Sequence, residues 1–145
     1  MPCRAEDLPT SYDFAMPPMI RFGSGRIGEI SELVGMWGRE AWIVGGGRSL
    51  VASGAKERIE TSLTAAGIPH RHVATAAGEP TVDHVAVALA SLPRGDRSGV
   101  VVVAVGGGST IDLAKAVAAL APLLPAGAPA EELDALVVDH LEGVG

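Results

Sequence analysis

Aliphatic runs and helical spacings of apolar residues alternate along this chain. Four segments are typical of strands: 19–22, 41–44, 68–73 and 100–105. The pattern at 68–73 is weaker than the others, and 100–105 contains no polar residue. Apolar positions three or four apart predict helices over 27–37, 51–66, 82–89, 109–121 and 131–141. Strands that alternate with helices of this length form βαβ units. We therefore expect an α/β fold, a Rossmann-like parallel sheet with helices on both faces.

Three glycines, Gly106, Gly107 and Gly108, follow the most apolar strand, and Ser109 opens the helical pattern behind them. Glycines let a ligand approach the backbone closely, and the first turn of a helix presents unpaired N–H groups. This predicts a site for a phosphate or pyrophosphate. Steric need alone explains the turn equally well, with Ser109 and Asp112 forming a capping box.

The sequence of this turn matches neither of the two common nucleotide-binding motifs. The dinucleotide fingerprint would need glycine in place of Ile111, and the nucleotide-triphosphate loop would need lysine directly after the glycines. A second glycine run, 45–47, follows the strand at 41–44. Both runs therefore fall at the carboxyl ends of strands, the edge at which parallel α/β sheets bind ligands.

Composition narrows the class of protein. The 145 residues are 48% hydrophobic and 19% charged, which predicts one compact domain. A net charge of −6 without a basic stripe argues against nucleic-acid and membrane-surface partners. Cys3 is the single cysteine, so an internal disulfide is excluded. With no signal-peptide pattern and no apolar run long enough to cross a bilayer, we expect a cytoplasmic protein.

The four histidines, at 70, 72, 84 and 140, do not form a recognisable metal motif. His70 and His72 share one face of a strand, but an isolated His-x-His pair is more often surface decoration than a metal site. No serine, histidine and aspartate set, paired carboxylates or zinc-type cysteine cluster is recognisable either. We therefore assign neither catalytic residues nor metal ligands.

Five segments, in this order and covering nearly the whole chain, resemble the N-terminal domain of the iron-containing (group III) alcohol dehydrogenases, relatives of glycerol dehydrogenase and dehydroquinate synthase. They are 17–25, 41–44, 53–54, 78–80 and 106–115. The last resembles the family's G-G-G-S-x-x-D-x-x-K signature and is the most specific.

The resemblance implies a nicotinamide cofactor lying across the sheet. Backbone N–H groups of Gly106, Gly107, Gly108 and Ser109 would hold its pyrophosphate, in agreement with the anion site expected from the turn itself. Asp112 corresponds to the family's acidic position beside the cofactor. A structural role for Asp112, as a capping carboxylate that pairs with Lys115, is compatible with that one. Pro80 and Lys115, from the matching segments, complete this part of the expected cofactor site.

The resemblance also places the adenosine ribose at the turn after the second strand. A carboxylate there would bind the ribose 2′-hydroxyl, and members that prefer NAD tend to carry an aspartate. This chain instead has Gly46, Gly47, Arg48 and Ser49. Arg48 offers a charge-assisted fork to a 2′-phosphate, so we expect NADP to be preferred over NAD. The alternative is that Arg48 is solvated and Ser49 caps the next helix.

The family holds its iron or zinc in a second, all-helical domain through one aspartate and three histidines, after a loop rich in proline and threonine. This sequence ends before that loop. We therefore expect 1–145 to be the dinucleotide-binding domain, with a core over 23–121, a Pro/Ala/Gly linker over 122–130 and a terminal segment, 131–145, leading toward the helical metal domain.

On this interpretation the chain is the NAD(P)-binding part of a metal-dependent alcohol dehydrogenase and is inactive alone. The expected partners are the dinucleotide, a second chain carrying the helical domain, and further copies of this chain. The alternatives are a non-catalytic nucleotide-binding module and a truncated remnant.

Overall fold

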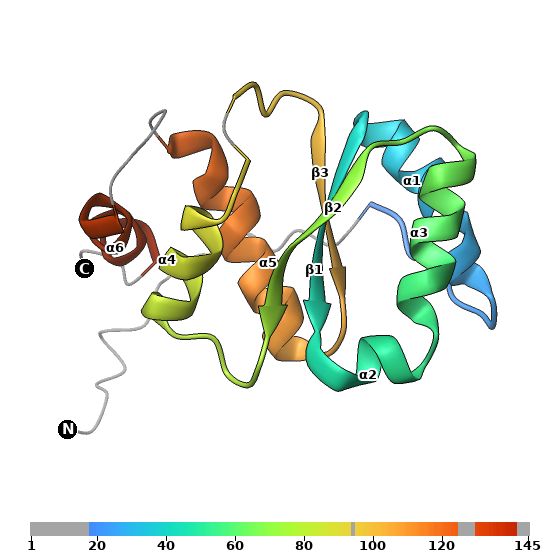
Figure 1. Ribbon diagram of the computed structural model, residues 1–145, viewed down its shortest axis with the longest axis horizontal. Coiled ribbons are helices and arrows are strands. Elements are labelled where there is room, and N and C mark those ends of the chain that lie inside the picture. Colours follow the sequence, from blue (N-terminus) through green and yellow to red (C-terminus); the bar gives the residue numbers. More distant parts are fainter. Residues whose placement is uncertain (1–17, 94, 125–129, 142–145) are drawn as a thin grey trace, which may run out of the picture.

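The computed structural model describes residues 18–93, 95–124 and 130–141 (Figure 1). Strands β1 (Glu40–Gly46), β2 (His70–Ala76) and β3 (Val100–Val105) form a parallel sheet in the order β2-β1-β3. The helices are η2 (Arg26–Glu29), α1 (Ile30–Trp37), α2 (Gly47–Ala52), α3 (Ala55–Ala65), α4 (Val82–Ala90), α5 (Gly108–Leu120), η3 (Ala121–Leu123) and α6 (Ala130–Leu141). The expected α/β fold, a parallel sheet surrounded by helices, is confirmed.

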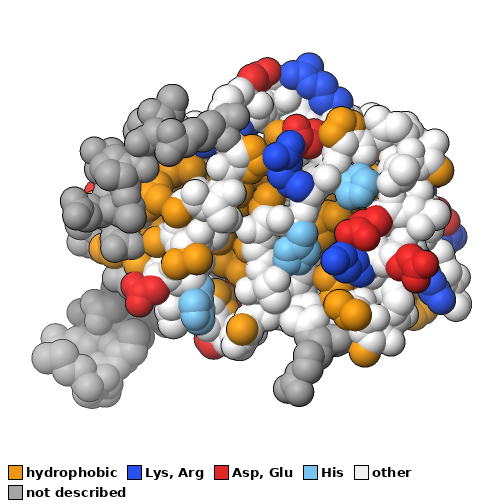
Figure 2. All heavy atoms as spheres, viewed as in Figure 1, with side chains coloured by type: hydrophobic (Ala, Val, Ile, Leu, Met, Phe, Trp, Pro, Cys, Tyr) orange, Lys and Arg blue, Asp and Glu red, His pale blue; other side chains and the backbone are white. Residues whose placement is uncertain are grey.

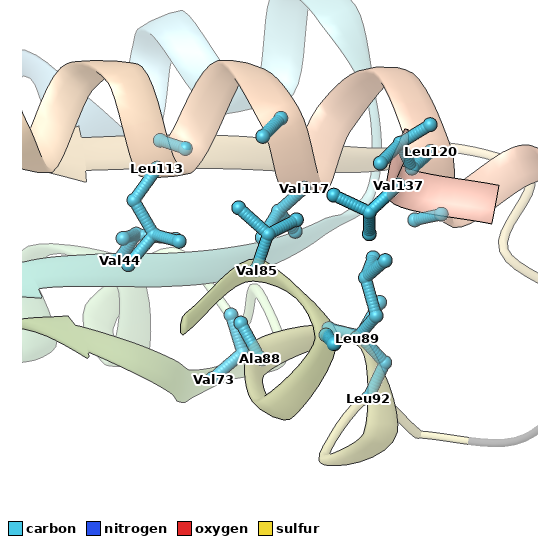
Figure 3. Close-up of a cluster of buried hydrophobic side chains, with 14 of the residues drawn as sticks. Val44, Val73, Val85, Ala88, Leu89, Leu92, Leu113, Val117, Leu120 and Val137 are labelled. Atoms are coloured by element: carbon cyan, nitrogen blue, oxygen red, sulfur yellow. The ribbon is translucent and has the colours of Figure 1, made fainter. Parts of the chain in front are cut away.

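Two apolar clusters, one on each face of the sheet, hold these layers together. Alternate β1 residues face opposite ways: Trp42 and Val44 belong to the cluster with α4, α5 and α6, and Ala41 and Ile43 to the cluster with α1 and α3. A strand segment buried on both faces has to be apolar, as the buried residues 41–45 of β1 are. Figure 3 shows the larger cluster, with side chains of β1, α4, α5 and α6 meeting at the buried Val117.

Parallel pairing brings the carboxyl ends of all three strands to one edge of the sheet. Near the end of β1, Gly45 is opposite Thr75 of β2 and Val105 of β3. Figure 1 shows α2 and the start of α5 side by side at this edge, the lower one in that view. The two glycine runs are therefore neighbours in space although they are about sixty residues apart in sequence.

The expected strand at 19–22 is wrong: no strand is assigned there. Arg21 instead donates hydrogen bonds to Glu29 and Glu32, both at 2.9 Å, and each bond lowers the pKa of the carboxyl group that accepts it. Phe22 is 95% exposed. A strand requires a neighbouring strand to pair with, and none of the described residues provides one for this segment.

The helix expected over 51–66 is two helices. α2 begins four residues earlier, at Gly47, and Gly54 separates it from α3 with a φ of 67°. The first expected helix likewise begins as the 3-10 turn η2 before α1. Gly67, also at a φ of 67°, ends α3 as expected. Among the described helices, none has both the length and the apolar character needed to cross a membrane.

Candidate functional site

The turn after β3 separates two kinds of glycine. A β carbon added to Gly106 would lie 2.9 Å from the Thr110 β carbon, so packing of the turn against α5 requires glycine there. A β carbon added to Gly107 or Gly108 would have no neighbouring atom within 4 Å, and neither residue has a positive φ. The fold itself therefore gives no reason for glycine at these two positions, and their open side leaves the backbone accessible to a ligand.

Helix α5 begins at this open turn. The carbonyl of Gly107 accepts hydrogen bonds from the N–H groups of Thr110 and Ile111, both at 3.1 Å. The first N–H groups of a helix have no acceptor within it, and its N-terminus carries partial positive charge. Gly107 and Gly108 thus combine an open approach with the electrostatics that an anion needs.

The capping box expected from Ser109 and Asp112 is wrong. Gly107 is the N-cap of α5, no side chain caps the helix, and Ser109 is its second residue. The expected pairing of Asp112 with Lys115 is present, at 3.5 Å between Oδ1 and Nζ, with both side chains more than half exposed. An ion pair so accessible to water contributes little to stability, and leaves the Asp112 carboxylate accessible to a ligand.

Asp112 and Pro80 line one cavity of about 260 Å³ between α4, α5 and α6. The other lining residues are Thr81, Val82, Val85, Ala116 and Val137. Thr81 is fixed by a capping box, as its Oγ1 accepts from the His84 N–H at 3.3 Å and its own N–H donates to His84 Nδ1 at 3.2 Å. Val137 was not anticipated here, because amphipathic spacing places α6 on a core without saying beside which helices.

The turn after β1 is shorter than expected, since Gly45 and Gly46 belong to the strand and α2 begins at Gly47. Gly47 is exposed, and a β carbon there would make only an ordinary contact of 3.9 Å. A surface hollow of about 670 Å³ adjoins it, lined also by Val51, Ala52 and Thr75. Arg48 and Ser49 come directly after Gly47 in the first turn of α2, and no acidic residue occurs between 45 and 52.

The expected cofactor residues therefore fall into two groups at one edge of the sheet. Asp112 of α5 lines the same cavity as Pro80 and follows the β3 turn, while the residues of the β1 turn lie at the start of α2. Lys115 does not line the cavity and lies almost one turn further along α5.

The histidines are held separately by local contacts. Nδ1 of His70 is 3.0 Å from the Ile68 carbonyl oxygen, and Nδ1 of His140 is 3.0 Å from that of Leu136. Figure 2 shows the histidine side chains of one face standing apart from one another. Within 18–93, 95–124 and 130–141, no three His, Cys, Asp or Glu side chains gather in a way that would hold a metal ion.

Comparison with known proteins is consistent across sequence and structure. The family model of the iron-containing alcohol dehydrogenases matches residues 17–138. The NADH-dependent butanol dehydrogenase A of Clostridium acetobutylicum is 29% identical over 109 residues, which cover 75% of this chain and 28% of that protein. The crystal structure of NADH-dependent butanol dehydrogenase A from Thermotoga maritima superposes with a TM-score of 0.61 at 30% identity, over 75% of this chain and 27% of the other. The aligned part thus spans little more than a quarter of either relative.

Proposed function

Because the chain belongs to the iron-containing alcohol dehydrogenase family, we propose that it forms the nicotinamide-dinucleotide-binding part of an alcohol dehydrogenase. The reaction is reversible hydride transfer between an alcohol or aldehyde and the nicotinamide ring. The observation that carries the proposal is the open backbone at Gly107 and Gly108, where α5 begins and no steric reason for glycine exists. The two relatives are NADH-dependent butanol dehydrogenases, which supports a nicotinamide cofactor.

The pyrophosphate binds at the start of α5. N–H groups of Gly107, Gly108 and Ser109 point toward it, and the helix dipole offsets its charge. Gly106 allows the chain to turn tightly against Thr110 and so sets the direction of these donors. This arrangement does not depend on a lysine directly after the glycines. The sequence motif of the nucleotide-triphosphate loop is therefore not needed here.

The nicotinamide half of the cofactor lies toward the cavity beside Pro80. Asp112, at the border of that cavity, accepts a hydrogen bond from a hydroxyl or amide of the cofactor. Lys115 pairs with Asp112 at 3.5 Å along α5, between Nζ and Oδ1. The apolar walls, Val85 and Val137 among them, exclude water from that side of the ring.

The adenosine half lies toward the β1 turn, beside Gly46, Gly47, Arg48 and Ser49. The turn and the start of α2 contain no carboxylate to bind a ribose 2′-hydroxyl or to repel a 2′-phosphate. We therefore propose that NADP is preferred over NAD, in contrast to the NADH dependence of the two relatives.

The iron of this family would, when bound, polarise the oxygen of the alcohol or aldehyde. The described residues do not fit it, because they include no group of three potential ligands. Residues 1–145, with a core over 23–121, form the domain proposed here. By itself this domain binds the dinucleotide and does not turn over an alcohol. A non-catalytic nucleotide-binding module is the second candidate, since the open backbone at the start of α5 is compatible with cofactor binding alone.

Titration of the purified chain with NADPH and NADH, monitored by nicotinamide fluorescence, tests the proposal. We expect saturable binding with NADPH the tighter ligand, and at least about a tenfold loss in Gly107→Val, whose side chain fills the open approach. Gly28→Val is the matched control, because Gly28 also has open space around it but lies in η2.

Three outcomes contradict parts of the proposal. Absence of binding to both cofactors would refute the dinucleotide site, and tighter binding of NADH would refute only the NADP preference. Iron-dependent oxidation of alcohols by this chain alone would refute the claim that it binds without turning over.

A further inference from the structure

His72 of β2 packs on the bare α carbon of Gly45 in β1. A β carbon at Gly45 would lie 2.7 Å from His72 Nε2 and 2.5 Å from Leu50 Cδ2. The imidazole and the Leu50 side chain thus occupy the space that any larger residue at position 45 would need. Three elements, β2, β1 and α2, meet at this one contact.

An irregularity in the sheet gives His72 this position. Ile43 is opposite His72, but the next β1 residue, Val44, is opposite Ala74, so Val73 is an extra residue in β2. Such bulges redirect side chains and are common next to functional sites. Here Val73 enters the core that contains α4, while His72 interacts with Lys56 and Glu60 of α3 on the other face.

The contact lies directly beneath the β1 turn. Gly45 is two residues before Gly47, where α2 begins, and Leu50 is the buried anchor of that six-residue helix, at 5% exposure. Its neighbour Val51 is 68% exposed. A helix this short is not stable through its own hydrogen bonds, so the packing of Leu50 determines where it begins.

We propose that His72 is a positioning residue of the nucleotide site, which fixes the start of α2 by packing on Gly45 beside Leu50. This inference rests on the proposed function, which places the adenosine half of the cofactor at the start of α2. His72 is on β2, and β1 separates it from β3 and the pyrophosphate turn. It acts through Gly45 and Leu50, without touching the reacting atoms.

The charge state of His72 adds a consequence. Partial burial, and to a smaller extent the charge of Lys56, lowers the pKa of His72, and Glu60 opposes this in part. His84 of α4 lines the same groove as His72 beside β2 and is a further titratable group there, besides Lys56 and Glu60 of α3. A lowered pKa means that the packed arrangement favours the neutral ring, so its contribution is present at neutral pH and is lost as the pH falls through that pKa. Cofactor affinity should fall in the same direction.

Four variants separate positioning from general stability: His72→Ala, His72→Gln, Gly45→Ala and the double variant Gly45→Ala/His72→Ala. The readouts are the NADPH dissociation constant from about pH 5.5 to 8 and the melting temperature. His70→Gln is the matched control, because His70 is on the same strand at the opposite edge of the sheet, opposite Ala41. His72→Gln keeps a polar side chain of similar length, but its amide does not change charge with pH.

We expect His72→Ala to weaken NADPH binding about threefold to tenfold at neutral pH, with His70→Gln unchanged. Wild-type affinity should fall about threefold from pH 7.5 to 5.5, and His72→Gln should bind like wild type at pH 7.5 without that fall. Gly45→Ala should weaken binding more than His72→Ala, and the double variant should recover part of that loss, because one of the two clashing side chains is gone.

Wild-type affinity for His72→Ala would overturn the inference while leaving the proposed function intact. So would the same pH profile in His72→Gln and wild type, or equal losses in Gly45→Ala and the double variant. If the wild-type chain binds neither NADPH nor NADH, the proposed function fails first and the inference fails with it.

Discussion

The two glycine turns at the carboxyl edge of the sheet are alike in how their glycines are packed. At or just before each turn, one glycine is closely packed: Gly106 contacts Thr110, and Gly45, near the end of β1, contacts the side-chain ends of Leu50 and His72. In each, a later glycine has no such neighbour, Gly108 in one and Gly47 in the other. In these two turns, glycines that the fold requires can thus be told apart from glycines that it does not, and the second kind leaves the backbone at the carboxyl edge open to a ligand.

The helices behind the two turns differ in length and anchoring. The β3 turn leads into α5, a helix of 13 residues with six buried side chains, whereas the β1 turn leads into the six-residue α2. The first turn leads into this well-buried helix and precedes an acid, Asp112. The second leads into a short helix anchored by the buried Leu50 and precedes Arg48. We interpret the β3 turn as the anion site and the β1 turn as the end that selects between cofactors.

The largest effect should come from filling the crowded glycine of the β3 turn. Gly106→Ala forces a β carbon against Thr110, and overpacking of this kind costs about 1–3 kcal/mol of unfolding free energy. Gly108→Ala is the matched variant: at the first position of α5 it should stabilise the chain by about 0.5 kcal/mol and still weaken NADPH binding about tenfold.

Chemical denaturation and cofactor titration of both variants measure these effects. Equal stability of Gly106→Ala and Gly108→Ala would remove the distinction between required and open glycines. Unchanged binding by Gly108→Ala would remove the role assigned to the open ones.

A smaller effect is expected from changing the charge at the β1 turn. Arg48→Asp should shift the ratio of NADPH to NADH affinity about tenfold toward NADH, because a carboxylate binds a ribose 2′-hydroxyl and repels a 2′-phosphate. Competitive titration with both cofactors measures the ratio. Arg58→Asp, the same charge change at an exposed residue of α3, is the control, and an equal shift in both variants would point to net charge rather than to this turn.

The smallest effect is expected at Asp112. Its ion pair with Lys115 is exposed, so Asp112→Ala should change the free energy of unfolding by less than about 0.5 kcal/mol. NADPH binding should nevertheless weaken about threefold through loss of one hydrogen bond. Asp96→Ala breaks another exposed ion pair, with Arg39, and should leave binding unchanged. If both variants bind like wild type, Asp112 has only a structural role.

Much of this arrangement was predictable from the sequence, for a physical reason. The apolar run Val100–Val105 packs against the clusters on both faces of the sheet, although as an edge strand it has only Val103 fully buried. The glycines after it indicate the edge at which a site lies. The start of α5 was not predictable, because a capping box at Ser109 and a glycine cap at Gly107 are both compatible with the same residues. The segment at 19–22 has a strand-like pattern, yet pattern alone does not supply a pairing partner.

The role of His72 was also beyond the sequence. Its position over Gly45 depends on the extra residue Val73 in β2, and a bulge leaves no reliable signal in a run such as His70–Ala76. The cavity beside Pro80 likewise depends on where α6 packs, which its amphipathic pattern does not specify.

One measurement tests most directly whether the two turns hold a single dinucleotide. In a titration of the isotopically labelled chain with NADPH, monitored by amide nuclear magnetic resonance, the amides of Gly47, Gly107 and Gly108 should shift together with one dissociation constant. Gly28 in η2 should not shift. Inorganic pyrophosphate should move only the amides of the β3 turn. Shifts confined to one turn with NADPH, or an unperturbed β3 turn, would contradict the account.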